Sequence, residues 1–471
     1  MEHKKNEENV KIKIIGYGMN GEGVARWKDL VIFVPFAIKD ETVKAKITKV
    51  KNNIAFAELT EILTPSPLRT TPQCPHFTKC GGCNLMHMPY ETQLKTKQSS
   101  LNTTLAKQLG HGHEVKPTTP SPNTTAYRNK IELTVQNDKI GFLSPNSHKI
   151  IEIADCPLCN PSLKTFLETA RPLLKTNTTV RNIVIRTVEN TTAITFVTNT
   201  SQKFNLKPWL EPLKAQFKNL SVFQNINTKK TSEVFGPKFV HLYGPKTQTI
   251  HFMGIKYNVS PYAFLQINDA VASQIYTEVL NHIPQGSNVI NAYSGAGLLT
   301  ALISKNAKHV IGIEINPDAT QNANRLMSDN NITNAENICG DCAKLTSVLY
   351  KFSENKSKII ENKQKNNVYN KKISKNPEII NFSENNLEEA NKFILIVDPP
   401  RKGLDTAFLN ACINARPEKV IYISCNPATL SRDLKRLMPY YKISLIQPFD
   451  MFPHTKHIET LCVLNVKSVQ K

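Results

Sequence analysis

The stretch that decides the fold is VIYISCNPATLSRDLKRL, residues 420–437. Its first part, Val420–Ser424, is a short run of apolar and β-branched residues, which is typical of a buried strand. An Asn-Pro pair ends this run, and the apolar residues that follow recur at helical spacing, which predicts a helix over residues 428–437. Cys425 therefore stands where a strand ends and a helix begins, the edge at which open α/β sheets bind ligands.

Cys425 is either a reactive thiol or a buried packing residue. A helix N-terminus lowers the pKa of a nearby thiol and favours the nucleophilic thiolate, but cysteines at strand ends are also often simply buried. Two other segments favour the chemical role. FILIVDPPRKG, residues 393–403, is an apolar strand followed by Asp398, and FPHTKHIETLCVLNV, residues 452–466, places Glu459 at the start of a last strand. A thiol and carboxylates at neighbouring strand ends can meet in one cleft and act together in nucleophilic catalysis.

From Ile255 onward, strand patterns alternate with helix patterns, as in VINAYSGAGLLTALIS (289–304) and HVIGIEIN (309–316). This alternation predicts a parallel sheet with helical crossovers. The last two strand patterns, KISLIQPFD and ETLCVLNV, follow each other without a helix and predict a hairpin. Seven strands with an antiparallel end are the architecture of the class I methyltransferases, which are Rossmann-like α/β proteins.

Residues at the ends of these strands indicate a nucleotide ligand. The turn with Gly295 and Gly297 suits any Rossmann-like nucleotide site. Glu314 follows that turn by about 20 residues, the usual distance of an acid that holds ribose hydroxyls. Asp341, after the third strand, would reach an adenine amino group. Because the sequence has neither a P-loop nor a full G-x-G-x-x-G, it favours S-adenosylmethionine over NAD.

Length and charge set broad limits. The chain has 471 residues, which predicts two to four domains, and 59 Lys and Arg against 38 Asp and Glu give a net charge of +21. An excess this large indicates a polyanionic partner, most simply nucleic acid, although a compositional bias toward Lys and Asn would also produce it. No apolar run approaches the roughly 18 residues of a membrane helix, and the N-terminus lacks a secretory signal, so we expect a cytoplasmic protein.

Residues 9–63 alternate between apolar and polar positions, with turns rich in glycine and asparagine, which predicts a small β-barrel. The pattern IGYGMNGEGVARWKDLVIFVPFAIKDETVKAKITKVKNNIAFAE resembles a TRAM domain, an OB-like barrel associated with RNA modification. Barrels of this kind bind nucleic acid on one face. The alternative is a barrel with only a structural role, but the local density of lysines favours RNA.

Three cysteines, Cys74, Cys80 and Cys83, have the spacing C-x5-C-x2-C. Clustered thiols need a fourth ligand, for which Cys156 is the candidate, with Cys159 as a spare. Four thiolates suit either zinc or an iron–sulfur cluster, and the spacing does not choose between them. Ten cysteines in a chain expected to be cytoplasmic favour metal binding or catalysis over disulfides.

These patterns predict a multidomain protein. Residues 1–65 form the OB-like barrel, residues 66–250 a central α+β domain with the metal cluster site, and residues 251–471 the methyltransferase domain. The central domain begins with an amphipathic helix predicted over residues 84–110 and continues as a β-rich pattern. Residues 346–392 are polar and rich in Lys and Asn, which predicts an exposed insertion. The alternative interpretation is a loop that contacts RNA.

Together these segments resemble the uracil-5 RNA methyltransferase family that carries a TRAM domain and an iron–sulfur cluster, of the 23S rRNA 5-methyluridine type. The resemblance runs from about Ile12 to Val466 apart from the insertion, on the motifs CPHFTKCGGC, FLQIN, NAYSGAG, IVDPPRKGLD, YISCNPATLSRDL and DMFPHTKHIETLCVL. It implies a 4Fe-4S cluster on Cys74, Cys80, Cys83 and Cys156. It implies that S-adenosylmethionine is held by Gln266, by the turn with Tyr293 and Gly295, and by Glu314, Asp341 and Asp398.

The resemblance also implies a reaction, in which Cys425 matches the family nucleophile and Glu459 the general base. Attack of the thiolate on carbon 6 of uracil creates an enolate, whose carbon 5 then takes the methyl group from S-adenosylmethionine. Glu459 removes the proton on carbon 5, and the thiol is eliminated. The uridine must leave its stack to react, and Phe264 is either a stacking surface for it or a core residue.

Three positions depart from the family pattern. Asn291 and Ser294 stand where an Asp and a Cys are usual, which predicts weakened or rearranged cofactor contacts, and Leu265 replaces a common aromatic residue. The implied substrate is 23S rRNA, because bacterial members with both accessory features act there, and the T-loop of tRNA is the alternative. A non-catalytic RNA-binding protein with a decayed methyltransferase domain is a further alternative, against which the intact Cys425 and Glu459 argue.

Overall fold

The computed structural model describes residues 8–136, 138–145, 147–174, 179–229, 233–260, 263–342 and 393–468, so the predicted insertion at 346–392 lies outside the described residues. The chain forms two compact units. The first consists of Met1–Lys107, Glu114–Ile275 and Gln447–Glu459, and the second of Gln108–His113, Tyr276–Ile446 and Thr460–Lys471. The segment Gln447–Glu459 thus belongs to the first unit although it comes late in the sequence. The predicted domain boundaries at 65/66 and 250/251 stay predictions.

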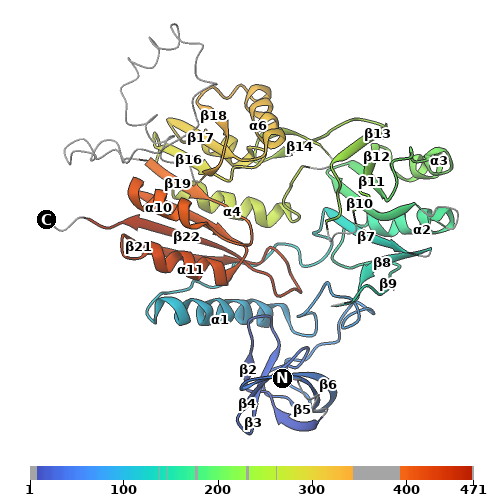
Figure 1. The fold of residues 1–471 in the computed structure, drawn as a ribbon, viewed down its shortest axis with the longest axis vertical. Coiled ribbons are helices and arrows are strands. Elements are labelled where there is room, and N and C mark those ends of the chain that lie inside the picture. The colour runs from blue at the N-terminus through green and yellow to red at the C-terminus, as the bar shows by residue number, and fades with distance from the viewer. Residues whose placement is uncertain are drawn as a thin grey trace. The chain divides into compact units, whose positions relative to one another are not determined.

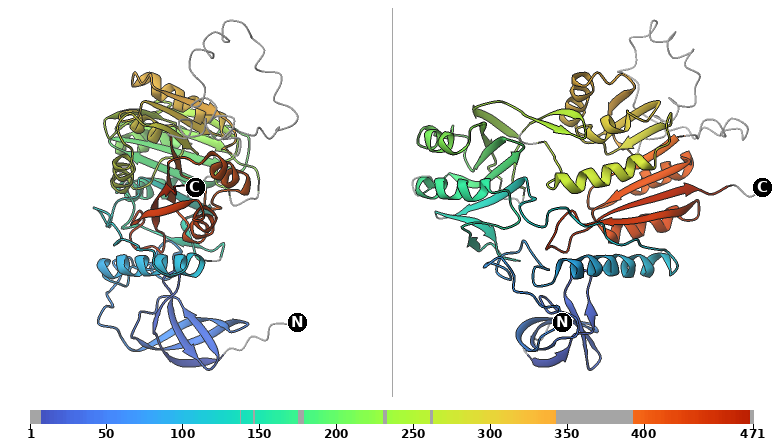
Figure 2. Two further views of the ribbon diagram at one scale, coloured as in Figure 1. Left: turned by 90° about the vertical axis from the view of Figure 1, so that its left-hand side faces the viewer. Right: turned by 180° about the vertical axis from the view of Figure 1, so that it is seen from behind.

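The N-terminal sheet has six strands in the order β1-β5-β6-β4-β3-β2. They are β1 (Asn9–Lys13), β2 (Gly16–Tyr17), β3 (Gly23–Trp27), β4 (Leu30–Val34), β5 (Thr42–Lys51) and β6 (Ile54–Thr64). Alternate residues of β1 and β5 are buried, as expected when one face of a strand lines a core. The amide of Ile15, just after β1, donates to the carbonyl of Val24 in β3 at 2.7 Å. This bond links the two ends of the sheet, which curls round on itself (Figure 2) as predicted.

Helix α1 (Tyr90–Leu109) ends where the sequence predicts but begins six residues later than the predicted start at residue 84. The early start is wrong because Pro89 disfavours helical backbone at the residue before it, so residues 84–88 form turns and the helix begins only after the proline. The amides of Asn84 and Leu85 in these turns donate to the carbonyl of His454 at 3.0 Å.

The central sheet has seven strands in the order β13-β12-β11-β10-β7-β8-β9. They are β7 (Lys130–Gln136), β8 (Lys139–Leu143), β9 (Ile150–Glu152), β10 (Val180–Val188), β11 (Thr191–Thr198), β12 (Leu220–Ile226) and β13 (Lys238–Tyr243). Helices α2 (Ser162–Leu174) and α3 (Lys207–Gln216) supply Phe166 and Trp209 to its apolar core. This is the predicted α+β arrangement. A hairpin of β14 (Gln248–Phe252) and β15 (Ile255–Val259) follows, and then helix α4 (Asp269–Asn281).

The last sheet has seven strands in the order β18-β17-β16-β19-β20-β22-β21. They are β16 (Asn288–Ala292), β17 (His309–Glu314), β18 (Ala335–Cys339), β19 (Phe393–Val397), β20 (Lys419–Ser424), β21 (Tyr441–Phe449) and β22 (Glu459–Val466). Strands β16 to β20 run parallel, and β22 runs antiparallel to β20. The predicted parallel sheet with an antiparallel end is therefore confirmed.

Helices α5 (Leu298–Ile303), α6 (Pro317–Asp329), α10 (Thr406–Ala415) and α11 (Pro427–Leu437) connect the strands of this sheet, and α10 packs beside α11 (Figure 1). Helix α11 forms the second part of the stretch at residues 420–437, where the sequence predicts a helix. The side chain of Asn426 caps it by accepting a hydrogen bond from the amide of Ala428 at 3.1 Å, and proline occupies the first turn. Within the described residues, no helix combines the length and the apolar composition needed to cross a membrane.

Candidate active site and thiol pocket

The parallel strands bring most of the predicted site residues to one edge of the last sheet. Strand β16 is followed by Tyr293 and Gly295, β17 ends at Glu314, β18 is followed by Asp341, β19 by Asp398 and β20 by Cys425. Because these strands run parallel, their carboxyl ends share one edge, which is where such sheets bind ligands. Five strand ends that are scattered over more than a hundred residues of sequence thus contribute to one place.

The turn after β16 is built around the carboxylate of Glu314. Tyr293 and Gly295 have φ values of 61° and 55°, a left-handed backbone that strains a tyrosine and suits a glycine. The amide of Gly295 donates to Oε2 of Glu314 at 3.0 Å, and the amide of Asn316 donates to Oε1 at 2.8 Å. These two bonds fix the carboxylate at the strand end and leave lone pairs on both oxygens for hydroxyl donors.

Ile315 is a residue that the sequence reasoning missed. It follows Glu314 directly and is 67% exposed, which is unusual for an isoleucine at the end of a buried strand. The signal in the sequence was an apolar residue between two polar ones, where the strand pattern had already ended. Its position offers an apolar surface beside the carboxylate of Glu314.

Two of the three departures from the family pattern, Asn291 and Ser294, differ in what they contact. Asn291 is 1% exposed, and its Nδ2 donates to Oγ1 of Thr300 in α5 at 2.9 Å, so it ties the strand to the next helix. The hydroxyl of Ser294 is buried and has no hydrogen-bond partner among the described residues. The predicted weakening or rearrangement of cofactor contacts at these positions stays a prediction.

Asp398 is the carboxylate whose titration the site changes most. Partial burial of this residue raises its pKa to about 7, because the ionised form is less well hydrated there than in water. Near neutral pH this group is therefore poised between a neutral acid and a carboxylate. A cation bound beside it would favour the carboxylate and release the proton.

Strand pairing relates Cys425 to Glu459. Ser424 at the end of β20 pairs with Thr460 in β22, and Cys425 and Glu459 are the next residue on each strand. Cys425 is half-buried, and the Glu459 side chain is only 9% exposed. The register therefore brings the chain at both residues to the same end of the β20–β22 pair, and their catalytic roles stay predictions.

Phe264 and Gln266 belong to the first compact unit. Phe264 is 75% exposed, which excludes the alternative that it is a core residue, whereas Leu265 beside it is buried. The backbone carbonyl of Gln266 accepts a hydrogen bond from Nδ2 of Asn129 at 2.9 Å, which fixes the chain at this point. The cofactor role of the Gln266 side chain stays a prediction.

The cysteines predicted as metal ligands line one pocket, here called the thiol pocket, of about 190 Å³. Its thiols are those of Cys74, Cys80, Cys83, Cys156 and Cys159, and its other lining side chains include Phe77, Phe142, Ile153, Leu158 and Arg128. The loop that carries the first three cysteines, residues 74–83, is here called the thiol loop. It is tightly wound, because the amides of Phe77 and Cys80 donate to the carbonyls of Cys74 and His76. All ten cysteines are described, and none forms a disulfide.

Of the cysteines in this pocket, Cys159 is buried and the other four are half-buried. Burial raises the pKa of Cys83 to about 12 and also raises that of Cys80 and Cys74. The hydrogen bond from Cys159 lowers the pKa of Cys156. Among the described residues, no three His, Cys, Asp or Glu side chains are arranged as the ligands of one metal ion.

The family follows from a comparison of the whole sequence. Residues 89–467 match the model of the tRNA (uracil-5-)-methyltransferase family, and residues 4–60 match the TRAM domain. The chain belongs to the tRNA (uracil-5-)-methyltransferase family. The predicted family, the TRAM domain and the enzyme class, an RNA (uracil-5-)-methyltransferase, are thereby confirmed.

Relatives of this chain match nearly all of its length. An uncharacterized RNA methyltransferase of Bacillus cereus is 33% identical over 96% of this chain and 95% of its own length. One of Clostridium acetobutylicum is also 33% identical, over 99% and 98%. The crystal structure of the Pyrococcus abyssi tRNA (uracil-54, C5)-methyltransferase with S-adenosyl-L-homocysteine matches 97% of this chain and 100% of its own, with a TM-score of 0.71 and 24% identity. That structure supports the same fold for this family member.

Proposed function

We propose that this enzyme transfers a methyl group from S-adenosylmethionine to carbon 5 of a uridine in RNA, through a covalent bond between Cys425 and carbon 6. The observation that carries the proposal is the position of Cys425, which follows β20 at the sheet edge shared with Glu314 and Asp341. A nucleophile at the nucleotide-binding edge is what this chemistry requires.

Each residue at the edge has a role in this proposal. Glu314 accepts hydrogen bonds from the ribose hydroxyls of S-adenosylmethionine, Asp341 accepts from the adenine amino group, and the side chain of Ile315 packs on the ring. The backbone turn at Tyr293 and Gly295 and the side chain of Gln266 contact the remainder of the molecule. The carboxylate of Asp398 faces its positive charge. The hydrogen bonds that fix the Glu314 carboxylate support its role.

The steps follow from the chemistry of uracil, whose carbon 5 is a poor nucleophile. The Cys425 thiolate forms a bond to carbon 6, and the displaced electron pair moves onto the ring as an enolate. Carbon 5 then takes the methyl group, and S-adenosylhomocysteine leaves. Glu459 accepts the proton from carbon 5, the electron pair of that C–H bond restores the ring double bond, and the bond to Cys425 breaks. The exposed ring of Phe264 supplies a surface on which a base taken out of its stack can rest.

The titration of Asp398 makes cofactor binding depend on pH. Below pH 7 this group is protonated and neutral, so it must lose a proton before it can face a cation, and binding weakens as the pH falls. The dissociation constant of S-adenosylmethionine should therefore rise toward about tenfold for each pH unit below 7 and stay flat above it. Calorimetry between about pH 5.5 and 8.5 measures this directly. The control, Asp398→Asn, should bind more weakly at high pH and show no such slope, and a wild type without a slope would contradict the contact.

For the thiol pocket we propose a 4Fe-4S cluster on Cys74, Cys80, Cys83 and Cys156. Four thiols around one pocket supply the ligand set that such a cluster requires, and the resemblance to the uracil-5 RNA methyltransferase family favours the cluster over zinc. The guanidinium of Arg128 in the same lining would offset the negative charge of four thiolates. When bound, the cluster would act as a crosslink of the thiol loop to the loop at Cys156, which follows β9.

The proposed identity of the metal group in this pocket can be tested directly. Protein prepared without oxygen should show broad visible absorbance and about four iron and four sulfide per chain. Cys83→Ser should lose both, because the cluster then lacks a ligand, whereas Cys339→Ser, an exposed thiol of the other unit, should keep them. Colourless protein with one zinc per chain would show the cluster assignment to be wrong.

For the substrate we propose 23S rRNA first and tRNA second. The first follows from the resemblance described above, and the second is favoured because the Pyrococcus abyssi relative acts on tRNA. Mapping 5-methyluridine in total RNA from cells with and without this gene separates them. Loss of a 5-methyluridine in 23S rRNA supports the first, loss in tRNA supports the second, and no change in either RNA would refute the proposed function.

A further inference from the structure

The segment that leads to Glu459 is not an ordinary surface loop. Residues Asp450–Ile458, here called the arm, connect β21 to β22, and each of them is buried or half-buried. The arm has no helix or strand of its own, so its backbone groups need partners from elsewhere. Those partners come from several segments of the same compact unit.

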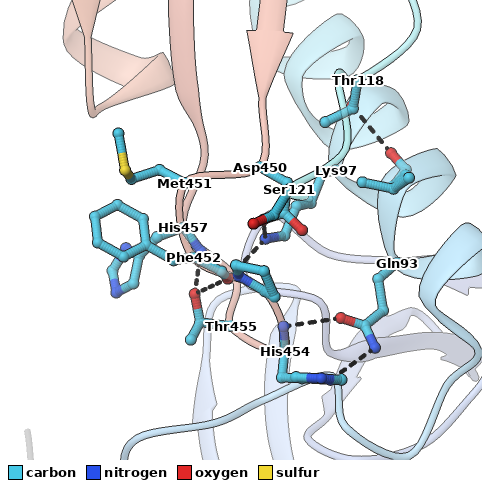
Figure 3. Close-up of polar contacts among 12 residues, drawn as sticks. Gln93, Lys97, Thr118, Ser121, Asp450, Met451, Phe452, His454, Thr455 and His457 are labelled. Atoms are coloured by element: carbon cyan, nitrogen blue, oxygen red, sulfur yellow. Dashed lines mark hydrogen bonds and ion pairs between the residues drawn. The ribbon is translucent and has the colours of Figure 1, made fainter. Parts of the chain in front are cut away.

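Two side chains of helix α1, which lie one turn apart, bind the arm (Figure 3). Nζ of Lys97 lies 2.5 Å from Oδ1 of Asp450 and 3.1 Å from the carbonyl of Phe452, and the side chains of this ion pair are 2% and 0% exposed. Gln93, which is fully buried, accepts a hydrogen bond from the amide of His454 at 2.9 Å, and its Nε2 lies 3.1 Å from Nδ1 of the same residue. Both contacts are specific for the arm's present conformation.

The arm's successive carbonyls are bound one after another. Nδ2 of Asn268 donates to Met451 at 3.2 Å, Lys97 to Phe452, and the hydroxyl of Tyr127 to Pro453 at 3.1 Å. The carbonyl of His454 accepts from two amides that follow the thiol loop. Four consecutive carbonyls are thus held by donors from four separate segments. An irregular loop whose carbonyls were merely solvated by water would not need this set of partners.

Residues next to the thiol loop and the thiol pocket also bind the arm. The two amides that hold His454 are those of Asn84 and Leu85, directly after Cys83, and Tyr127 precedes Arg128 of the thiol pocket. Oδ1 of Asn84 also accepts from the amide of Lys456 at 3.4 Å. Residues adjacent to the thiol pocket and residues of helix α1 therefore both form hydrogen bonds with the same short part of the arm.

We propose that α1 and the thiol loop position the general base, with Gln93 and Lys97 as positioning residues for removal of the carbon 5 proton. This inference rests on the proposed role of Glu459. Nucleophilic attack and methyl transfer come before proton removal and do not need the base. A displaced arm should therefore slow the last step selectively, because a small misplacement of a reacting group has a large effect on rate.

The test uses Gln93→Met, with Gln98→Met as the matched control. Gln98 lies on the same helix, but its Nε2 donates to the carbonyl of Val115 and not to the arm. With ordinary RNA and S-adenosylmethionine in a single turnover, Gln93→Met should release methylated RNA roughly 10- to 100-fold more slowly than the wild type. The methylated RNA should accumulate as a covalent adduct with the protein. Hydrogen exchange of the arm amides should also become faster. Gln98→Met should change neither the rate at which methylated RNA is released nor the hydrogen exchange of the arm.

A Glu459→Gln variant separates the failure of this inference from failure of the proposed function. If it accumulates methylated adduct while Gln93→Met releases RNA like the wild type, the positioning inference is wrong and the base assignment stands. If it does not accumulate adduct, the base assignment is wrong and the inference falls with it. If Gln93→Met slows methyl transfer and release equally, its role is only structural. Should Gln93→Met not fold, Gln93→Glu, which keeps the acceptor for the His454 amide, is expected to show a weaker form of the same accumulation.

Discussion

Cys425→Ala is expected to abolish RNA methylation, lowering turnover by at least about 10⁴-fold, the usual scale for losing a nucleophile that forms the covalent intermediate. The variant should also fail to form an adduct with RNA that contains 5-fluorouridine. In that RNA, fluorine replaces the hydrogen that Glu459 would remove, so the wild type should remain joined to the base. Denaturing electrophoresis of the complex after incubation with S-adenosylmethionine measures the adduct directly.

The matched control for this experiment is Cys412→Ala. Cys412 is another thiol of the second unit, buried in α10 and not at the end of a strand. It should form the fluorinated adduct like the wild type. Cys425→Ala should still bind S-adenosylmethionine with unchanged affinity, because none of the proposed cofactor contacts is removed. An adduct that survives in Cys425→Ala would show that another group is the nucleophile.

Lys97→Met is expected to lower the free energy of local unfolding of the arm by about 3–5 kcal/mol, because it leaves the carboxylate of Asp450 buried without its counter-ion. Burial alone lowers the pKa of Lys97, and the carboxylate opposes that effect. The loss is therefore dominated by the uncompensated charge, not by the missing hydrogen bond. Native-state hydrogen exchange of the arm amides reports this local free energy.

Two further variants make the interpretation specific. Lys95→Met removes an exposed lysine of the same helix that pairs with Glu91 at the surface, and it should leave the exchange of the arm unchanged. The double variant Lys97→Met with Asp450→Leu replaces both buried charges by apolar groups and should recover much of the loss. If the double variant is as unstable as Lys97→Met alone, packing around the lysine stem and not the charge explains the effect.

The fold of the last sheet could be predicted because its signals are local. Most of its parallel strands are short apolar runs, and the site residues predicted on this sheet lie at or within three residues of a strand end, as Glu314 and Cys425 do. Alternation with helices then specifies parallel pairing, and parallel pairing gathers the strand ends. The thiol pocket was predicted for a similar reason, because Cys74, Cys80 and Cys83 are close in sequence.

The contacts between α1 and the arm could not be predicted in this way. Lys97 looks like any polar residue of an amphipathic helix, and its partner Asp450 is 353 residues away. The bonds from the amides of Asn84 and Leu85 to His454 could not be predicted for the same reason, since their acceptor lies near the far end of the chain. The exposure of the Ile315 side chain could not be predicted, because it depends on which segments surround the strand end. A sequence pattern gives only the order of residues.

The separation of Lys97 from Asp450 has a consequence for biosynthesis. Proteins are made from the N-terminus at about 5–20 residues per second, so roughly 20–70 s pass between the synthesis of the lysine and that of its counter-ion. During that interval α1 carries an ammonium group whose place in the mature enzyme is dry, with no acidic partner yet made. The nascent chain therefore cannot complete its catalytic apparatus while the ribosome is still translating the methyltransferase sheet. On the roles proposed for Cys425 and Glu459, the enzyme should stay inactive toward RNA in its surroundings until its last strands have been made.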